Sequence, residues 1–371
     1  MTTFYYEYIR YRNFNFEGFF NSISDYDIER VISKDKLNIY DFLTLLSPNA
    51  EKYLEIMAQK AHRVTIQNFG RVILLYIPMY LANYCINKCA YCGYNADNKI
   101  KRNIMSIEDV RHEAELISQK GFRHILILTG ESRAKTPVSY IKTCVAVLKE
   151  YFSSICIEIY PLKEKEYEEL VHAGVDSITI YQETYDEKTY DEVHLSGPKK
   201  NYKYRLETPD RACRAGIKNV NIGALLGLND WRKDVFYTAL HAKYLQDKYG
   251  DVDVGVSVPR IKPHIGAFQP KSNVSDKNLV QIILSFRIFM PRLGISLSTR
   301  ESADLRNNLI PLGITKFSAE SSTKVGGYLE EKEYEDSGQF EVSDNRSLEE
   351  IVEMIRSSGY QPIFKDWENV I

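Results

Sequence analysis

The stretch VILLYIPMYLANYCINKCAYCGYN, residues 72–95, joins a short apolar run to three cysteines at Cys85, Cys89 and Cys92. The apolar run contains Pro78 and is too short to cross a membrane, so it predicts a buried strand with the cysteines in the following loop. Disulfide frameworks use cysteines in pairs, and a structural zinc ion usually takes four ligands. Three cysteines within eight residues therefore need a different explanation.

The other cysteines do not supply a fourth ligand. They lie singly in apolar segments, as expected of buried thiols, at Cys144, Cys156 and Cys213. A redox Cys-x-x-Cys pair would use Cys89 and Cys92 and leave Cys85 without a role. A 4Fe–4S cluster fits better, because three thiolates leave one iron open to an external ligand. The loop therefore predicts a catalytic cluster, with zinc binding and a simple electron carrier as the alternatives.

Short apolar runs alternate with longer helix-like segments from residue 71 onward. Eight runs are candidate strands, at 72–78, 124–130, 154–161, 177–183, 220–228, 254–260, 294–300 and, more weakly, 313–319. Strands that alternate with helices imply a parallel sheet, and eight such units predict a closed (βα)8 barrel of the TIM type. An open doubly wound sheet is the alternative, but no Gly-x-Gly-x-x-Gly follows the first run.

The barrel is expected to cover residues 71–319, between two smaller parts. Residues 1–70 predict a helical extension, in which Ser47 and Pro48 start a helix that Gly70 ends. Residues 320–371 predict a loop and a helix packed on the barrel.

The polar segment from Ser318 to Arg346 is long for a compact domain, which suggests a lid or a partner surface. Ser347 and Glu350 predict a capping box at the start of the last helix.

The composition is that of a globular protein, with 44% hydrophobic and 26% charged residues in 371. The net charge of −2 gives no reason to expect nucleic acid or a membrane as a partner. The N-terminus, MTTFYYEYIRYRNF, has no apolar signal-peptide core. We therefore expect a cytoplasmic protein whose cysteines are thiols or metal ligands.

Polar and glycine residues stand at the ends of the predicted strands, where barrel enzymes carry their chemistry. They are Thr129, Gly130, Glu131, Glu158, Gln182, Glu183, Gly227, Arg260, Arg300 and Ser318.

The cysteine loop resembles that of the radical S-adenosylmethionine (SAM) superfamily. The resemblance implies that SAM chelates the open iron and that the reduced cluster cleaves SAM to a 5′-deoxyadenosyl radical. It places Tyr91 beside the adenine and a Glu183–Arg205 pair on the zwitterionic SAM. A surface ion pair between Arg205 and Glu207 is the alternative. The cofactor-binding residues expected in this way are Tyr91, Thr129, Gly130, Glu131, Glu158, Glu183 and Arg205, with Thr129 replacing the first glycine of a Gly-Gly-Glu-like turn.

From about Leu46 to Trp367 the chain resembles the tyrosine lyase family of thiamine biosynthesis. The resemblance rests on further motifs that occur in the same order, namely LTGE, YQETY, RLETPDR, GALLGL, SVPRIKP, LSTRE, GGY and KDW. The resemblance implies that the radical takes a hydrogen from the amino group of L-tyrosine. Cleavage of the Cα–Cβ bond then gives p-cresol and 2-iminoacetate (dehydroglycine), which thiazole synthase consumes. An electron donor such as flavodoxin or ferredoxin is implied as well.

Arg300, in LSTRE, is expected to bind the tyrosine carboxylate, because a guanidinium offers a planar two-pronged fork. It matches the carboxylate-binding arginine of related aromatic amino-acid lyases. Ser318 and Arg260 are the weaker candidates for substrate binding. The alternative is that Arg300 pairs with Glu301 or Asp304 at a helix start.

The related tyrosine lyase of iron-only hydrogenase maturation is the competing functional hypothesis. That family carries a second cysteine-bound cluster near its C-terminus, whereas no cysteine follows Cys213 here. The chemistry is therefore expected to stop at 2-iminoacetate. The sequence leaves open the oligomeric state, the reductant, the strength of a complex with thiazole synthase and the group that deprotonates the phenol.

Overall fold

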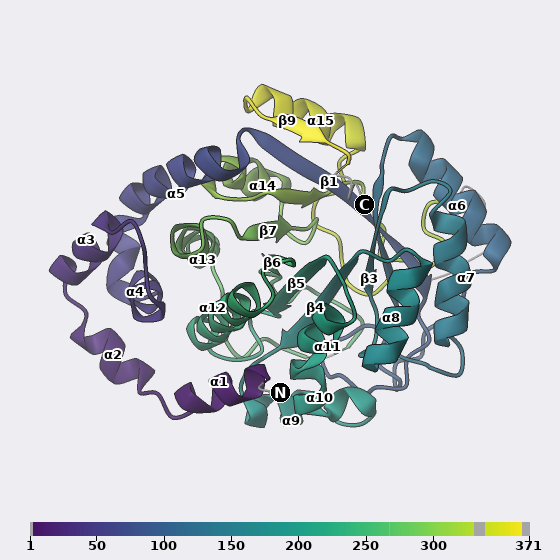
Figure 1. Ribbon diagram of the computed structural model, residues 1–371, viewed down its shortest axis with the longest axis horizontal. Coiled ribbons are helices and arrows are strands. Elements are labelled where there is room, and N and C mark those ends of the chain that lie inside the picture. The colour runs from purple at the N-terminus through teal and green to yellow at the C-terminus, as the bar shows by residue number, and fades with distance from the viewer. Residues whose placement is uncertain (1–2, 267, 330–337, 366–371) are drawn as a thin grey trace.

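The computed structural model describes residues 3–266, 268–329 and 338–365, and a closed parallel barrel lies at its centre (Figure 1). The barrel strands are β1 (Val72–Ala82), β2 (His124–Thr129), β3 (Ser154–Glu158), β4 (Ser177–Glu183), β5 (Asn219–Ala224), β6 (Asp253–Ser257), β7 (Gly294–Leu297) and β8 (Lys316–Ser318). Each strand pairs in parallel with its neighbour in chain order, and β1 pairs with both β2 and β8. The predicted (βα)8 barrel is confirmed, and the doubly wound alternative is wrong.

Helices surround the barrel because each connects the end of one strand to the start of the next (Figure 1). They are α6 (Ile107–Gln119), α7 (Val138–Leu148), α8 (Glu164–Ala173), α9 (Glu187–Val193), η2 (Pro198–Lys200), α10 (Tyr202–Leu206), α11 (Thr208–Arg214), α12 (Trp231–Lys248), α13 (Asp276–Phe289), α14 (Ala303–Leu309) and η3 (Ile310–Leu312). Apolar side chains of the strands and of the inward helix faces form one continuous core. This core holds the strand ends, and hence the loops that follow them, in fixed positions.

The residues before β1 are helical, as predicted. They form α1 (Phe4–Tyr11), α2 (Phe16–Ser22), α3 (Asp25–Ser33), α4 (Ile39–Leu45), η1 (Pro48–Tyr53) and α5 (Leu54–Phe69). The start expected at Ser47 is a 3₁₀ turn, in which the Ser47 side chain accepts from the N–H of Ala50, and α5 continues from it. Such turns are common at helix ends. Gly70 ends α5 with a φ of +67°, a conformation that suits glycine.

The C-terminal part adds a helix and a strand. The capping box of Ser347 and Glu350 starts α15 (Leu348–Ser357), as predicted. A ninth strand, β9 (Gln361–Ile363), was not predicted, and it pairs in parallel with β1 at Val72–Leu74. β1 is longer than β2, which pairs only with the later part of β1, so β9 satisfies backbone groups that β2 leaves open.

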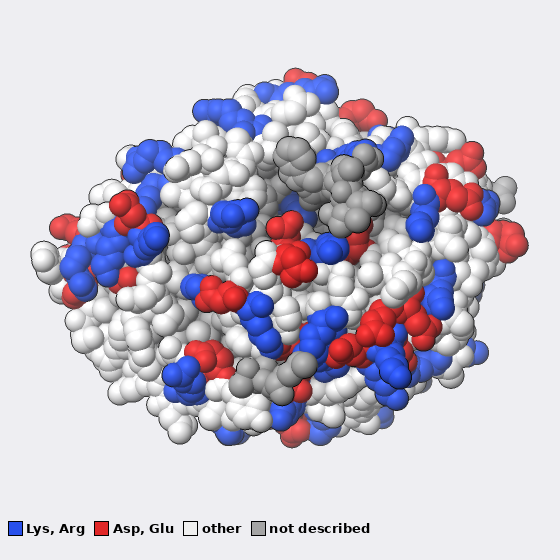
Figure 2. Space-filling model, viewed as in Figure 1, with Lys and Arg blue, Asp and Glu red and all other residues white. Residues whose placement is uncertain are grey.

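Acidic and basic side chains are interspersed over the face shown in Figure 2, in keeping with the small net charge. None of the helices in the described ranges is both long enough and apolar enough to span a membrane.

Candidate active site

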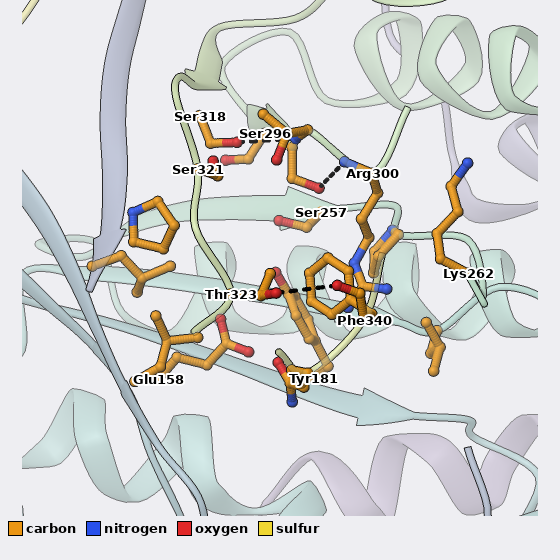
Figure 3. Close-up of a pocket in the computed structure, with 18 of the residues that line it drawn as sticks. Glu158, Tyr181, Ser257, Lys262, Ser296, Arg300, Ser318, Ser321, Thr323 and Phe340 are labelled. Carbon is orange, nitrogen blue, oxygen red and sulfur yellow. Dashed lines mark hydrogen bonds between the residues drawn. The ribbon is translucent and has the colours of Figure 1, made fainter. Parts of the chain in front are cut away.

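The ends of the barrel strands surround a cavity that six of the thirteen predicted site residues line. Figure 3 shows the side chains of Glu158, Tyr181, Arg300 and Ser318 arranged around this space. Tyr91, Cys92, Glu183 and Lys199 also line it. A second, adjoining pocket is lined by Glu131, Lys199 and Arg205, so Lys199 belongs to both. Arg260 is not among the residues that line either pocket.

The three cysteines lie in a loop that neighbouring segments hold by backbone hydrogen bonds. Ile86 N–H donates to the Glu131 carbonyl over 2.9 Å, and Ala90 N–H donates to Val193 over 2.9 Å. The pKa of the Cys89 thiol is raised to about 12, chiefly by burial, with Lys199 opposing the rise and the nearby Cys92 and Cys85 contributing to it. The three thiols are therefore close enough to interact electrostatically.

The donor set of this loop suits an iron–sulfur cluster. An amide N–H of Asn87 lies 3.8 Å from Cys85 Sγ, and an amide N–H of Gln339 lies 3.7 Å from Cys92 Sγ. N–H groups directed at thiolate sulfurs are typical of cluster surroundings. No three potential ligands converge on a single ion position within the described ranges. A cluster makes no such demand, because each thiolate binds a different iron.

Glu183 stands in a left-handed backbone conformation, with φ of +74°, at an irregularity of β4. This conformation is uncommon for a residue with a side chain and costs about 1–3 kcal/mol. The next two residues hold it in place, because the Asp234 carboxylate accepts from Tyr185 N–H over 2.8 Å and from the Thr184 hydroxyl over 3.0 Å. As a result, the Glu183 carboxylate faces the cavity instead of following the strand.

Two cations share the Glu183 carboxylate. Lys199 Nζ lies 2.7 Å from it and an Arg205 nitrogen lies 3.3 Å from it. Burial disfavours the charged carboxylate, yet Lys199 and Arg205 together hold the pKa of Glu183 below its usual value. The alternative pairing of Arg205 with Glu207 is wrong. Two cations on one anion leave an uncompensated positive charge, which suits a further carboxylate such as that of SAM.

The turn at Thr129, Gly130 and Glu131 packs directly against the cysteine loop. The Asn87 amide bridges the two, since it donates to Glu131 over 2.6 Å as well as to Cys85. Within the described residues, the buried Thr129 hydroxyl has no hydrogen-bond partner. The Thr129 side chain is not among the residues that line either pocket, so its contact with SAM stays a prediction.

Gly130 has no room for a side chain, because a Cβ atom would overlap the carbonyl oxygen of Tyr84. We expect Gly130→Ala to displace the cysteine loop, at a cost of about 1–3 kcal/mol for overpacking. Iron and sulfide content after anaerobic reconstitution should fall several-fold, while circular dichroism stays close to the wild type. Gly250→Ala is the matched control, because a Cβ there meets open space. Equal cluster content in the two variants would contradict this reading.

Tyr91 is held at the cavity wall by His194. Their Oη and Nε2 atoms lie 2.7 Å apart, and Nδ1 of His194 lies 2.7 Å from the carbonyl oxygen of Tyr190. Both ring nitrogens of His194 are thus engaged. Lys199 Nζ lies 5.5 Å from the centre of the Tyr91 ring. The phenol ring of the cysteine loop is therefore held in place beside Lys199, one of the two cations on Glu183.

The structure distinguishes between the two candidate arginines. Glu301 is bound by Arg260, with Nε–carboxylate distances of 3.1 and 3.2 Å, so the alternative pairing of Arg300 with Glu301 is wrong. Arg260 also pairs with Asp276 at 2.8 Å. The Arg300 guanidinium instead lies over the Phe340 ring, 3.3 Å from its centre. No carboxylate of the described residues forms an ion pair with Arg300, which leaves its fork available.

Ser318 and Glu158 complete the same cavity. The Ser318 hydroxyl accepts from Thr299 N–H over 3.0 Å, which orients it at the end of β8. Burial raises the pKa of Glu158 to about 7, with the charge of Glu183 adding to the effect and Arg300 opposing it. The cavity thus holds a cation and a titratable acid, the two charges that an amino-acid substrate needs.

Three polar residues of the site were missed by sequence reasoning. Asn87 lies between two of the cysteines, which by themselves account for the motif. Lys199 belongs to a connecting 3₁₀ turn. Gln339 lies far along the chain, in the segment that the sequence marked only as a lid or partner surface. The polar character of the loop at Asn87 was the one available signal.

Comparison of the sequence with known proteins supports this interpretation of the site. Residues 79–237 match the radical SAM superfamily, and residues 257–361 match the Biotin and Thiamin Synthesis associated domain. The barrel and the three-cysteine loop therefore define a radical SAM enzyme, which uses a 4Fe–4S cluster and SAM. The chain is 42% identical to the 2-iminoacetate synthase of Escherichia coli (strain K12), over 93% of this chain and 91% of that protein. It belongs to the 2-iminoacetate synthase family.

Other relatives are consistent with this membership. The 2-iminoacetate synthase of Salmonella typhimurium (strain LT2) is 41% identical over 92% of this chain and 91% of that protein. Among solved structures, HydG from Carboxydothermus hydrogenoformans, an FeFe-hydrogenase maturase, superposes with a TM-score of 0.91 at 32% identity, covering 99% of this chain and 86% of that chain. A further HydG structure gives 0.89 at 31% identity, with 94% and 78% covered.

Proposed function

We infer that this protein is a radical SAM lyase that cleaves the Cα–Cβ bond of L-tyrosine to 2-iminoacetate and p-cresol, for assembly of the thiamine thiazole ring. The observation that carries this inference is the 42% identity to a 2-iminoacetate synthase over nearly the full length of both chains. The iron-only hydrogenase maturase remains the second candidate, because HydG has the same barrel, but its identity is lower, at 31–32%. When bound, the reduced cluster and SAM supply a 5′-deoxyadenosyl radical.

The residues divide into a cofactor side and a substrate side. On the cofactor side, the thiolates of the cysteine loop hold the cluster, and Lys199 and Arg205 bind the SAM carboxylate while Glu131 and Glu183 face its positive groups. The contacts described above support this division, because both cations and both acids lie within one continuous wall. The loop contacts this wall directly, since Asn87 is hydrogen-bonded to Glu131 and to Lys199. The radical would therefore form at the edge of the cavity that Arg300 and Glu158 line.

On the substrate side, Arg300 binds the tyrosine carboxylate and Ser318 supports it. The free fork of Arg300 and its flat stacking on Phe340 support this role, because both fix the plane in which a carboxylate binds. Arg260 is already held by Glu301 and Asp276, which argues against it as the substrate arginine.

Glu158 has a substrate role in this proposal, whereas the sequence suggested contact with the cofactor. Its carboxyl group lines the same cavity as Arg300 (Figure 3), so it can pair with the ammonium group of tyrosine and accept a proton from it. A neutral amine is the form from which an N–H hydrogen atom is readily taken. The charged and titratable groups of the described residues that act on Glu158 are Glu183, Arg300, Arg205, Lys199, Cys156, Tyr76 and Tyr181.

This role predicts a pH dependence. The pKa of Glu158 is raised to about 7, so below that pH the group is mostly protonated and cannot pair with an ammonium group. Tyrosine-dependent p-cresol formation should therefore rise with pH through about 7 in the wild type. Glu158→Gln should lower p-cresol formation about tenfold or more and remove this rise, since general acid–base groups contribute about 10²–10⁴-fold. Uncoupled SAM cleavage, measured at each pH, is the internal control. An unchanged pH profile in Glu158→Gln would exclude this role.

Two protein partners accompany the proposed reaction. 2-Iminoacetate is an imine that hydrolyses in water, so a thiazole synthase that receives it directly is the proposed consumer. A flavodoxin or ferredoxin is the proposed electron donor, because the cluster must be reduced before SAM is cleaved.

One experiment tests the function as a whole. The reconstituted protein is incubated anaerobically with SAM, dithionite and L-tyrosine, and the products are analysed. We expect 5′-deoxyadenosine, p-cresol, and 2-iminoacetate or the glyoxylate formed by its hydrolysis. SAM cleavage that tyrosine does not accelerate, or acceleration without p-cresol, would contradict the proposal. Formation of carbon monoxide or cyanide would favour the maturase alternative.

A further inference from the structure

Residues 338–344, which we call the mouth segment, contact the segments that follow β6, β7 and β8 at the carboxyl ends of the barrel strands. Backbone N–H groups of this segment donate to Thr323, to Pro263 and to Thr299, with N–O distances of 3.3, 3.1 and 2.9 Å. The three acceptors belong to segments that follow different barrel strands. The mouth segment is thus fixed from several sides at the entrance of the cavity that Phe340 and Gln339 line.

Gln339 points its amide at the cysteine loop. Its Nε2 atom lies 3.7 Å from Cys92 Sγ, and its Oε1 atom accepts from the Tyr80 hydroxyl over 2.9 Å. Because Tyr80 occupies the oxygen, the N–H side of the amide faces the sulfur. Gly93, next to Cys92, lets the mouth segment approach, since a Cβ there would overlap the Gln339 carbonyl oxygen.

The neighbouring residue connects the same segment to the other side of the cavity. Phe340 lies under the guanidinium of Arg300, at 3.3 Å from the ring centre, and its carbonyl oxygen accepts from the Thr323 hydroxyl over 3.1 Å. Two adjacent residues therefore contact a cysteine of the loop and the arginine proposed to bind the substrate carboxylate. A carboxylate that binds Arg300 contacts the same planar guanidinium group that stacks on the Phe340 ring.

We propose that Gln339 is a positioning residue that donates a hydrogen bond to the Cys92 thiolate of the cluster, and that Phe340 makes this bond sensitive to the substrate at Arg300. The first half rests on the cysteine loop alone, and the second half rests on the proposed function. Reduction adds negative charge to a cluster, and N–H donors to its sulfurs stabilise that charge. The bond therefore raises the reduction potential and favours the reduced cluster.

The test is a redox titration of the reconstituted protein with SAM, followed by electron paramagnetic resonance. We expect Gln339→Leu to lower the ratio of reduced to oxidised cluster about tenfold at a fixed potential, equivalent to about 59 mV for one electron. Glu341→Gln is the matched control, because its exposed side chain lies in the same segment and is expected to leave the potential unchanged. Equal potentials in Gln339→Leu and the wild type, with full cluster content, would overturn the proposal.

A second variant covers the case in which Gln339→Leu binds less cluster. Tyr80→Phe keeps the amide but removes the hydroxyl that orients it, so the potential should fall in the same direction by a smaller amount. An unchanged potential in Tyr80→Phe, with Gln339→Leu unusable, would also overturn the proposal.

The coupling to substrate is measured separately. L-Tyrosine should shift the potential or the spectrum of the wild type, and Phe340→Leu should abolish this shift at a tyrosine concentration that saturates the variant. A shift that persists in Phe340→Leu would overturn the coupling. These signals need no turnover, so a failure of p-cresol formation would contradict the proposed function and leave the Gln339 test intact.

Discussion

Replacing Cys85, Cys89 and Cys92 together with alanine should leave a folded protein that holds almost no iron or sulfide. Thiolates are the ligands that hold such clusters, and the other cysteines are buried elsewhere in the barrel. The loop itself should persist, because backbone hydrogen bonds tie it to Glu131 and Val193. We therefore expect complete loss of SAM cleavage and of p-cresol formation with little change in circular dichroism. Anaerobic iron and sulfide analysis measures the effect.

A buried cysteine outside the loop provides the control. Cys213→Ala removes a buried thiol of α11 that is not one of the proposed cluster ligands. The variant should keep the cluster and the activity. A full 4Fe–4S signal in the triple variant would contradict the ligand assignment. Loss of the cluster in Cys213→Ala as well would show that reconstitution, and not ligation, limits the measurement.

The barrel could be predicted from the sequence because each of its strands is coded locally. Every strand is a short run of residues buried by the same core, and helix patterns separate the runs. β9 is different, since it pairs with the part of β1 that begins before the start of β2. Three residues that include Pro362 do not form a strand pattern, and no local feature indicates an unpaired edge elsewhere in the fold.

The site residues that belong to sequence motifs could be predicted. The residues that reach the site from connecting loops could not. The cysteines were identified by their spacing and Glu183 and Arg205 by resemblance, and the structure brings Glu183 and Arg205 together. Lys199 shares the Glu183 carboxylate, yet its position depends on how a turn after α9 folds back. Gln339 reaches the loop from a distant segment. Sequence alone does not indicate such contacts, because they depend on the packing of connections and not on a residue pattern.

Arg300→Lys should keep the cluster, yet lower p-cresol formation about a hundredfold, because a substrate misplaced by about 1 Å can cost that much. Lysine retains the charge but lacks the planar fork that binds a carboxylate at two points. It also lacks the flat group that stacks on Phe340, which holds the fork in its plane. Cluster content and uncoupled SAM cleavage should stay measurable, so the loss is specific to tyrosine. Product analysis at saturating SAM measures it.

Arg260→Lys is the matched control for Arg300→Lys. Arg260 is bound to Glu301 and Asp276 and does not line the cavity, so its replacement should affect the stability of the β6 loop more than the chemistry. Per cluster-loaded protein, p-cresol formation in Arg260→Lys should stay within a few-fold of the wild type, whereas Arg300→Lys loses it. The opposite result, near-normal p-cresol in Arg300→Lys and loss in Arg260→Lys, would assign the substrate carboxylate to Arg260. Because both substitutions keep the charge, the difference between them isolates the geometry of the fork.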